Sequence, residues 1–144
     1  LQPGQLLKIQ NAPNIEIRQF PLQDHPIFPK ICEVRVFPGP EWGAFPNSAR
    51  EHFLNQPFTL SKDSNRMGLR LREQLPETGH LSGLLSSAVL PGTIQVPSSG
   101  QPIILMADAQ TTGGYPRLAQ VCTNDLPILA QCRPGDQVRF RLHV

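Results

Sequence analysis

Sixteen prolines are spread along the 144 residues of this chain, and this density limits its fold more than any other feature. Proline lacks a backbone N–H and breaks the interior of a helix, so a bundle of long helices is not expected. Eleven glycines add further turns. At this length we expect one domain with a substantial core, built mainly from short strands joined by turns.

Charge, hydropathy and cysteine usage exclude several classes of protein. The formal net charge is +2, which lacks the clustered positive charge of a protein that binds duplex nucleic acid. No apolar run reaches the roughly 20 residues that a membrane-spanning helix needs. We therefore expect neither a nucleic-acid partner nor a membrane. Cys32, Cys122 and Cys132 are odd in number and far apart, which favours reduced thiols in a cytoplasmic protein over a secreted disulfide scaffold.

The beginning of the chain differs from the remainder. Residues 1–30 are rich in proline, Gln and Asn and alternate only briefly, so we expect an extended lead-in there and a barrel domain over residues 31–144. The chain opens at Leu1 with neither an initiator Met nor the pattern of a signal peptide. We therefore expect a piece of a longer protein.

Short apolar or alternating runs, bounded by Pro and Gly, predict seven or eight strands. The expected strands are residues 31–37, 58–60, 67–72, 93–96, 102–107, 118–122 and 137–143. Two short helices are expected, one over residues 48–54 with Asn47 or Ser48 as its N-cap, and one from Asn124 to about Gln131. This pattern predicts a mainly β fold, a closed or nearly closed barrel with two short helices.

Two polar, glycine-containing segments are candidates for chemistry. The first centres on Asn65 and Arg66, where the guanidinium offers a planar fork of donors to a carboxylate or phosphate. A hairpin turn with an exposed Arg is the alternative. The second is DAQTTGGYPR, residues 108–117, directly after a buried strand. Its glycines permit a positive φ and an anion-binding nest of N–H groups, although a long turn with capping hydroxyls explains it equally.

Two further residues stand out from their surroundings. Gln95 is polar within a strand, so it either faces solvent or points into the mouth of the barrel. Trp42 follows a turn, and core packing or anchoring at an interface is expected of it rather than catalysis. The four histidines lack metal-ligand spacing, and no metal site is expected from the residues themselves.

Several stretches resemble one known family in the same order along the chain. They are Val36–Trp42 with Phe45, Ser64–Leu71, Pro91–Pro97, Gly100–Ile103 and Leu105–Arg117. The chain is similar to the C-terminal half of the KipA family, also called allophanate hydrolase subunit 2 or the C subunit of the bacterial 5-oxoprolinase. It is also similar to one half of the carboxyltransferase part of urea carboxylase and urea amidolyase.

The resemblance implies a cyclophilin-like β-barrel that works with a KipI-type B subunit, with an A subunit and with its own N-terminal half, which is missing here. The implied activity is that of an ATP-dependent hydrolase in the cytoplasm that opens the 5-oxoproline lactam to glutamate. ATP and Mg²⁺ would be shared with the KipI-type partner. The chain alone is not expected to be active.

Phosphorylating a lactam oxygen requires cationic and N–H donors around phosphate and a site that aligns the amide. Catalytic roles are expected for Asp108, Arg66 and Gln110, substrate-binding roles for Asn65, Gln95, Thr111, Thr112 and Tyr115, and phosphate-binding roles for Gly113, Gly114 and Arg117.

Two alternatives stay open. The chain could belong to a biotin-dependent carboxyltransferase that acts on urea or another amide, or to a non-catalytic antagonist of a KipI-type kinase inhibitor. The sequence departs from the family at Ser86–Ser87, where members often carry Ser-Glu, and at Gly43–Ala44, where some members carry an acidic residue. An acidic role at those two places is therefore in doubt.

Overall fold

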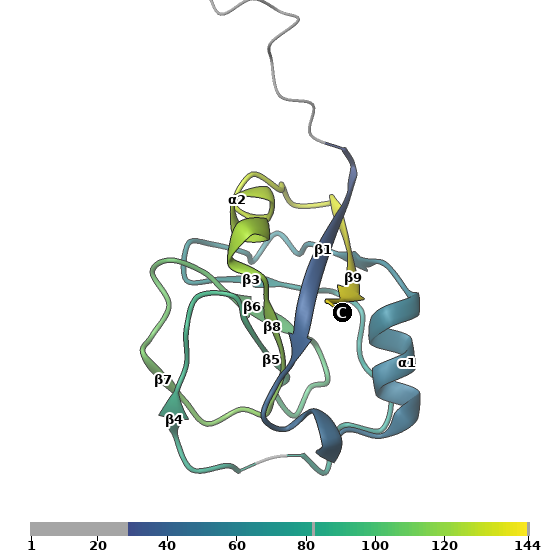
Figure 1. Ribbon diagram of the computed structural model, residues 1–144, viewed down its shortest axis with the longest axis vertical. Helices are drawn as coiled ribbons and strands as arrows, with labels where there is room; N and C mark the ends of the chain where they lie inside the picture. The colour runs from purple at the N-terminus through teal and green to yellow at the C-terminus, as the bar shows by residue number, and fades with distance from the viewer. Residues whose placement is uncertain (1–28, 82, 144) are drawn as a thin grey trace, which may run out of the picture.

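The computed structural model describes residues 29–81 and 83–143, so the predicted lead-in over residues 1–30 lies almost wholly outside the described residues. Seven strands form one curled sheet in the order β2-β9-β1-β8-β5-β6-β3 (Figure 1). These strands are β1 (Ile31–Pro38), β2 (Phe58–Thr59), β3 (Gly68–Arg70), β5 (Thr93–Gln95), β6 (Ile103–Leu105), β8 (Arg117–Val121) and β9 (Gln137–Leu142). Two short α-helices accompany them, α1 (Asn47–Asn55) and α2 (Leu126–Leu129), with 3-10 turns η2 (Trp42–Ala44) and η3 (Thr123–Asp125). The predicted mainly β fold with two short helices is confirmed.

The two edges of the sheet meet just beyond β2 and β3. Leu60 and Leu71 form an antiparallel bridge. On either side of it, the Arg72 N–H donates to the Thr59 carbonyl at 3.0 Å and the Ser61 N–H donates to the Arg70 carbonyl at 2.8 Å. The sheet is therefore a nearly closed barrel.

Strands β1 and β9 are neighbours next to β2 and run parallel to each other, whereas β1 pairs with β8 in the antiparallel direction. Cys32, Val34 and Val36 are buried along β1, and the residues between them are exposed. Val138 and Phe140 repeat this pattern on β9. A strand turns successive side chains to opposite faces, so this alternation places one apolar row from each strand in the core.

An aromatic cluster attaches helix α1 to this core beside β9 (Figure 1). The Phe53 ring stacks on Phe140 with centroids 4.4 Å apart, and both side chains are fully buried with Phe58. Trp42 packs edge-on against Phe53 at 6.4 Å, and the Arg50 guanidinium lies over the indole. Core packing, one of the two roles expected of Trp42, is what the structure shows.

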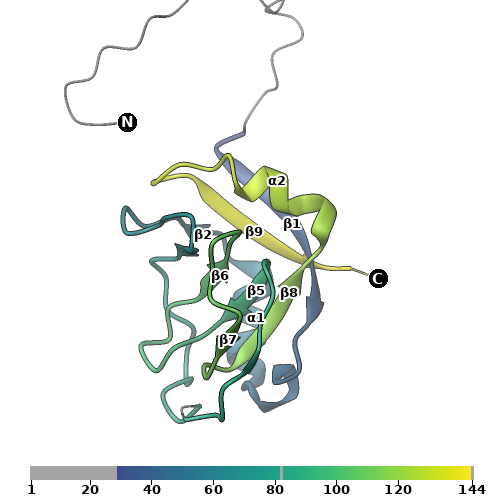
Figure 2. The same cartoon turned by 90° about the vertical axis from the view of Figure 1, so that its left-hand side faces the viewer.

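A second, two-stranded sheet pairs β4 (Ser87–Ala88) with β7 (Thr112–Gly113). The sequence predicted loops at both segments, because each is short, polar and without alternation. Figure 2 shows β5, β6 and β8 side by side below α2. Within the described parts of the chain, no helix combines the length and apolar character needed to cross a membrane.

The predicted N-cap of the first helix is wrong. Helix α1 begins at Asn47 after Pro46, and no side chain caps it. The Ser48 hydroxyl instead donates to the Glu77 carboxylate at 3.2 Å, and the side-chain oxygen of Asn47 accepts from the Arg50 guanidinium. Proline already sets the extended backbone that precedes the helix, so no side-chain cap is required there.

Candidate functional site

The two polar segments lie side by side although about 40 residues separate them along the chain. Strands β3 and β6 are antiparallel neighbours, and their pairing continues past both strand ends. The Met106 N–H donates to the Met67 carbonyl at 3.1 Å, and the Asp108 N–H donates to the Arg66 carbonyl at 3.0 Å. The turn that contains Asn65 and Arg66 is therefore held against the start of the 108–117 segment.

Arg66 and Asp108 form a bidentate ion pair at this junction. The Arg66 Nε donates to one carboxylate oxygen of Asp108 at 2.5 Å and an Nη donates to the other at 3.0 Å. These hydrogen bonds lower the pKa of Asp108 and raise that of Arg66. The side chains are 80% and 47% exposed, so the pair can open to a ligand at little cost.

A hollow of about 150 Å³ brings together four of the predicted residues, and we name it the amide pocket. Its walls are Asn65, Met67, Gly68, Arg70, Gln95, Ile103, Leu105, Gln110 and Tyr115. Of these, Asn65, Gln95, Gln110 and Tyr115 come from the sequence predictions, whereas Arg70 does not.

Gln95 forms the buried end of the amide pocket. Its side chain is only 1% exposed, and its Nε2 donates to the Tyr115 carbonyl at 3.2 Å. Of the two interpretations that the sequence allowed, solvent exposure is therefore wrong. A buried amide held in one orientation can present a defined hydrogen-bonding group to a small polar ligand.

Asn65 is oriented by its own turn. Its side-chain oxygen accepts from the N–H groups of Met67 at 2.8 Å and Gly68 at 3.3 Å. This Asx-type turn uses the acceptor end of the amide and leaves its NH₂ group for the pocket.

The remaining residues of the 108–117 segment lie elsewhere. Thr111 and Thr112 are exposed and lie outside the walls of the amide pocket, because this stretch pairs with β4. Gly113 and Gly114 do not use the positive φ that glycine permits, since the positive-φ glycines of the described residues are Gly83, Gly92, Gly100 and Gly135.

These two glycines are needed for close approach instead. A Cβ at Gly113 would lie 2.6 Å from the Gln95 Nε2, and one at Gly114 would lie 3.0 Å from the Leu84 carbonyl oxygen. The glycines therefore let the segment pack against Gln95 and the chain before β4. An anion-binding nest requires left-handed backbone, which this segment does not adopt.

Arg117 forms an ion pair with Glu41, which is not among the site residues predicted from the sequence. The carboxylate accepts from the Arg117 backbone N–H and Nε, both at 2.9 Å, and from an Nη at 2.6 Å. Another Nη reaches the Ala88 carbonyl at 3.2 Å. Both charged side chains are about one-fifth exposed. Nothing in the sequence around Glu41 indicates that its partner, Arg117, lies 76 residues away.

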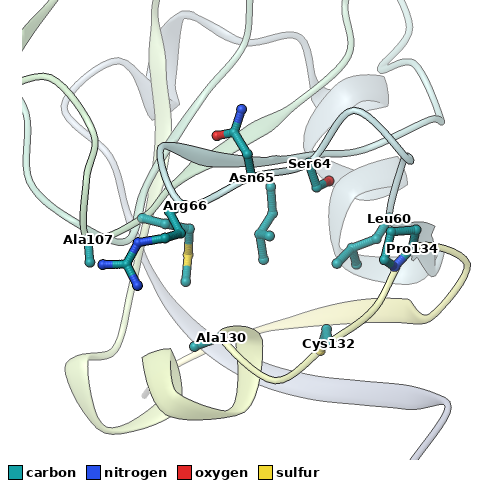
Figure 3. Close-up of a pocket in the computed structure, with 10 residues that line it drawn as sticks. Leu60, Ser64, Asn65, Arg66, Ala107, Ala130, Cys132 and Pro134 are labelled. Carbon is teal, nitrogen blue, oxygen red and sulfur yellow. The ribbon is translucent and has the colours of Figure 1, made fainter. Parts of the chain in front are cut away.

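A larger, mainly apolar pocket of about 320 Å³ lies on the other side of the Arg66 turn (Figure 3). Ser64, Asn65 and Arg66 line one side of it, and Ala130 and Cys132 line the opposite side. The Cys132 Sγ lies 3.1 Å from that of Cys32, and both are free thiols. Burial, aided by the neighbouring thiol, raises the pKa of Cys132 to about 12, so this thiol is protonated and unreactive near neutral pH.

The described part of the chain offers few ligands for a bound metal ion. No group of three or more His, Cys, Asp or Glu side chains there is arranged to hold an ion. Asp108 is a single carboxylate already paired with Arg66, so it could contribute at most one ligand to a Mg²⁺ carried by phosphates.

The chain belongs to the carboxyltransferase family described as "Carboxyltransferase domain, subdomain A and B". The model of that family matches residues 1–142. The chain is 47% identical over 107 residues to the 5-oxoprolinase C subunit of Escherichia coli, covering 74% of this chain and 34% of that protein. It is 41% identical over 144 residues to the 5-oxoprolinase C subunit of Haemophilus influenzae, covering 97% and 44%.

A solved structure agrees with this placement. The urea amidolyase of K. lactis superimposes with a TM-score of 0.72 at 25% identity, covering 80% of this chain and 8% of that one. The chain thus spans less than half the length of the relatives it matches.

Proposed function

We propose that this chain forms the C-terminal part of a 5-oxoprolinase C subunit, and that the amide pocket grips the lactam while it is activated. The identity of 41% over 97% of the chain to a protein of that name carries the proposal. The pocket supports it, because Asn65, Gln95 and Gln110 present amide groups that match the donor and acceptor of a lactam.

In the proposed reaction, the γ-phosphoryl group of ATP passes to the lactam oxygen and ADP is released. Water adds to the activated carbon, the ring nitrogen leaves as the amine, and a second water releases phosphate from the acyl phosphate. The products are glutamate, ADP and inorganic phosphate. The KipI-type B subunit, the A subunit and the N-terminal half of the C subunit would complete the complex, with ATP and Mg²⁺ shared among them.

Within this chain, we assign the phosphate contact to Arg66 rather than to Arg117. Arg117 is held by Glu41 and by the Ala88 carbonyl, whereas Arg66 is mostly exposed and its single partner is Asp108. A phosphate oxygen pair fits the same guanidinium fork that the Asp108 carboxylate fills. Displaced from Arg66, Asp108 becomes free to accept a proton or to contact Mg²⁺.

The test measures ATP consumption that depends on 5-oxoproline, using the full-length C subunit with its partner proteins. We expect Arg66→Gln and Asp108→Asn to lower turnover roughly 100-fold, because both act on developing charge. Arg141→Gln is the matched control, since it removes another exposed Arg–carboxylate pair far from the pocket, with Glu33. Equal turnover in all variants would refute the site, and no turnover by the wild-type complex would refute the function.

The likeness to urea amidolyase favours a second candidate, transfer of a carboxylate from carboxybiotin to an amide nitrogen. The same amide pocket would then align the nucleophile. The full-length protein would carboxylate urea in the presence of carboxybiotin and would leave 5-oxoproline unchanged. A protein that does neither and only binds a KipI-type partner would be the antagonist.

A further inference from the structure

Arg70 is the one charged side chain in the wall of the amide pocket, and it also lines an adjoining polar cleft of about 300 Å³. The cleft is formed by Ser61, Asp63, Arg70, Leu71, Pro97, Ser99, Gln101, Ile103 and Tyr115. Arg35, Arg66, Arg117 and Arg141 are all paired with carboxylates, but Arg70 forms no ion pair with any described residue. An unpaired guanidinium in a hollow is a site for an anionic group.

The sheet register places Arg70 opposite the buried amide. Arg70 pairs directly with Ile103 across β3 and β6, and Ile103 pairs directly with Gln95 across β6 and β5. Residues in direct register point to the same face, so these three form one row across the sheet. Strands lie about 4.8 Å apart, so the Cα atoms of Arg70 and Gln95 are roughly 10 Å apart, with the apolar Ile103 between them.

Gly68 keeps this row open. It precedes Arg70 by two residues and so faces the same side of β3, where it lines the pocket without a side chain. A Cβ there would lie 3.0 Å from the Ile103 Cγ2 and 3.3 Å from the Ile104 carbonyl oxygen. The floor between the cation and the amide is therefore small, apolar and accessible.

Resting on the function proposed above, we infer that Arg70 binds the carboxylate of the lactam substrate while Gln95 meets its ring amide. 5-Oxoproline carries its carboxylate and its lactam oxygen on the two ring carbons that flank the nitrogen, so these two groups point toward opposite ends of the molecule, and two methylenes form the edge of the ring opposite the N–H. The Arg70–Ile103–Gln95 row offers a cation for the carboxylate, an apolar floor for the ring and an amide for the lactam group. Asp63 shares the cleft but accepts from the Ser61 hydroxyl, at 3.1 Å, rather than from Arg70.

The test compares two substrates, 5-oxoproline and 2-pyrrolidinone, which is the same lactam without the carboxylate. In the reconstituted complex, we expect Arg70→Gln to raise the KM for 5-oxoproline roughly 10- to 100-fold, the range for losing a charge-assisted contact. We expect kcat at saturation to stay within a few-fold and the KM for 2-pyrrolidinone to stay unchanged. Arg70→Lys should restore part of the affinity, because it keeps the charge but not the fork.

Arg72→Gln is the matched control, because Arg72 is an exposed arginine two residues away that lines neither hollow. Wild-type KM values for both lactams are expected of it. If Arg70→Gln raises both KM values equally, or neither, the inference is overturned while the proposed function stands. If the wild-type complex consumes no ATP with 5-oxoproline, the proposed function fails. Calorimetric binding of 5-oxoproline to the full-length protein then still decides whether Arg70 holds the carboxylate.

Discussion

The Glu41 carboxylate accepts from a backbone N–H and two guanidinium nitrogens of Arg117, so one side chain ties the turn before η2 to the start of β8. A fork-to-fork pair of this kind is strong when it is shielded from water, and here about four-fifths of each side chain is covered. At the level of single residues, Glu41 therefore stabilises the point at which the 108–117 segment enters β8.

We expect Glu41→Gln to lower the free energy of unfolding by about 2 kcal/mol at pH 7, because a partly buried guanidinium loses its charged partner. Urea denaturation followed by circular dichroism measures this. Glu33→Gln is the matched control, since Glu33 pairs with Arg141 while nearly half exposed, and it should change stability by no more than about 0.5 kcal/mol. Equal losses in the two variants would contradict the assignment.

The loss of stability in Glu41→Gln is expected to depend on pH. The hydrogen bonds from Arg117 lower the pKa of Glu41 from its ordinary value of 4.5. The pair therefore contributes fully above pH 4.5, and its contribution is lost as the pH falls through the lower pKa of the folded state. The stability difference between wild type and Glu41→Gln should shrink there. A constant difference down to the acid transition would mean that the carboxylate charge is not what stabilises the fold.

At the level of elements, β1 ends in a turn that only glycine fits. The Gly39 N–H donates to the Leu118 carbonyl at 2.8 Å, and a Cβ at Gly39 would lie 2.1 Å from the Arg117 carbonyl oxygen. The atoms that this Cβ would meet belong to the backbone, which cannot move aside as the end of a flexible side chain can. The turn and β8 are therefore in contact through their main chains, and this contact sets the position of Arg117.

We expect Gly39→Ala to destabilise the protein by more than about 2 kcal/mol, because β1 and β8 must separate to admit the methyl group. Gly43→Ala, four residues further on, is the control, since a Cβ there meets nothing within 4 Å. That variant should be as stable as wild type or slightly more so, because alanine narrows the unfolded ensemble. Thermal unfolding of the two variants distinguishes them, and a stable Gly39→Ala protein would refute the packing.

At the level of the whole molecule, the aromatic cluster joins parts of the chain that are far apart in sequence. Phe53 comes from α1, Phe58 from β2 and Phe140 from β9, and all three are fully buried. The ring of Phe58 lies 5.8 Å from that of Phe140. The cluster therefore connects the helix to the barrel at the last strand.

Phe140→Ala should lower the free energy of unfolding by about 3–5 kcal/mol, the usual cost of removing a buried ring. Phe37→Ala is the comparison, because Phe37 is 45% exposed and contacts His143 at the surface. We expect it to cost far less. Similar midpoints in denaturant for the two variants would show that Phe140 is not part of the core.

The sequence predicted the long strands well, because alternation along a strand is a local pattern. The roles expected of Arg66 and Asp108 came from the family resemblance, and the contact between them follows from the pairing of β3 with β6, which no local pattern shows. The alternation along 137–143 and the family motifs around Arg66 and Asp108 are visible without coordinates. The Glu41–Arg117 pair and the row that contains Arg70 and Gln95 were not predictable. They depend on sheet register between distant strands, and register leaves no trace in a single sequence.

The parallel pairing of β1 with β9 has a consequence for biosynthesis. Residue 142 must leave the ribosome before β1 can complete its pairing with β9. Until then, the buried row of β1, which contains Val34 and Val36, lacks the core contacts that β9 supplies through Phe140. The barrel therefore cannot close until β9 has left the ribosome, and until then the exposed apolar row of β1 makes the polypeptide prone to aggregation.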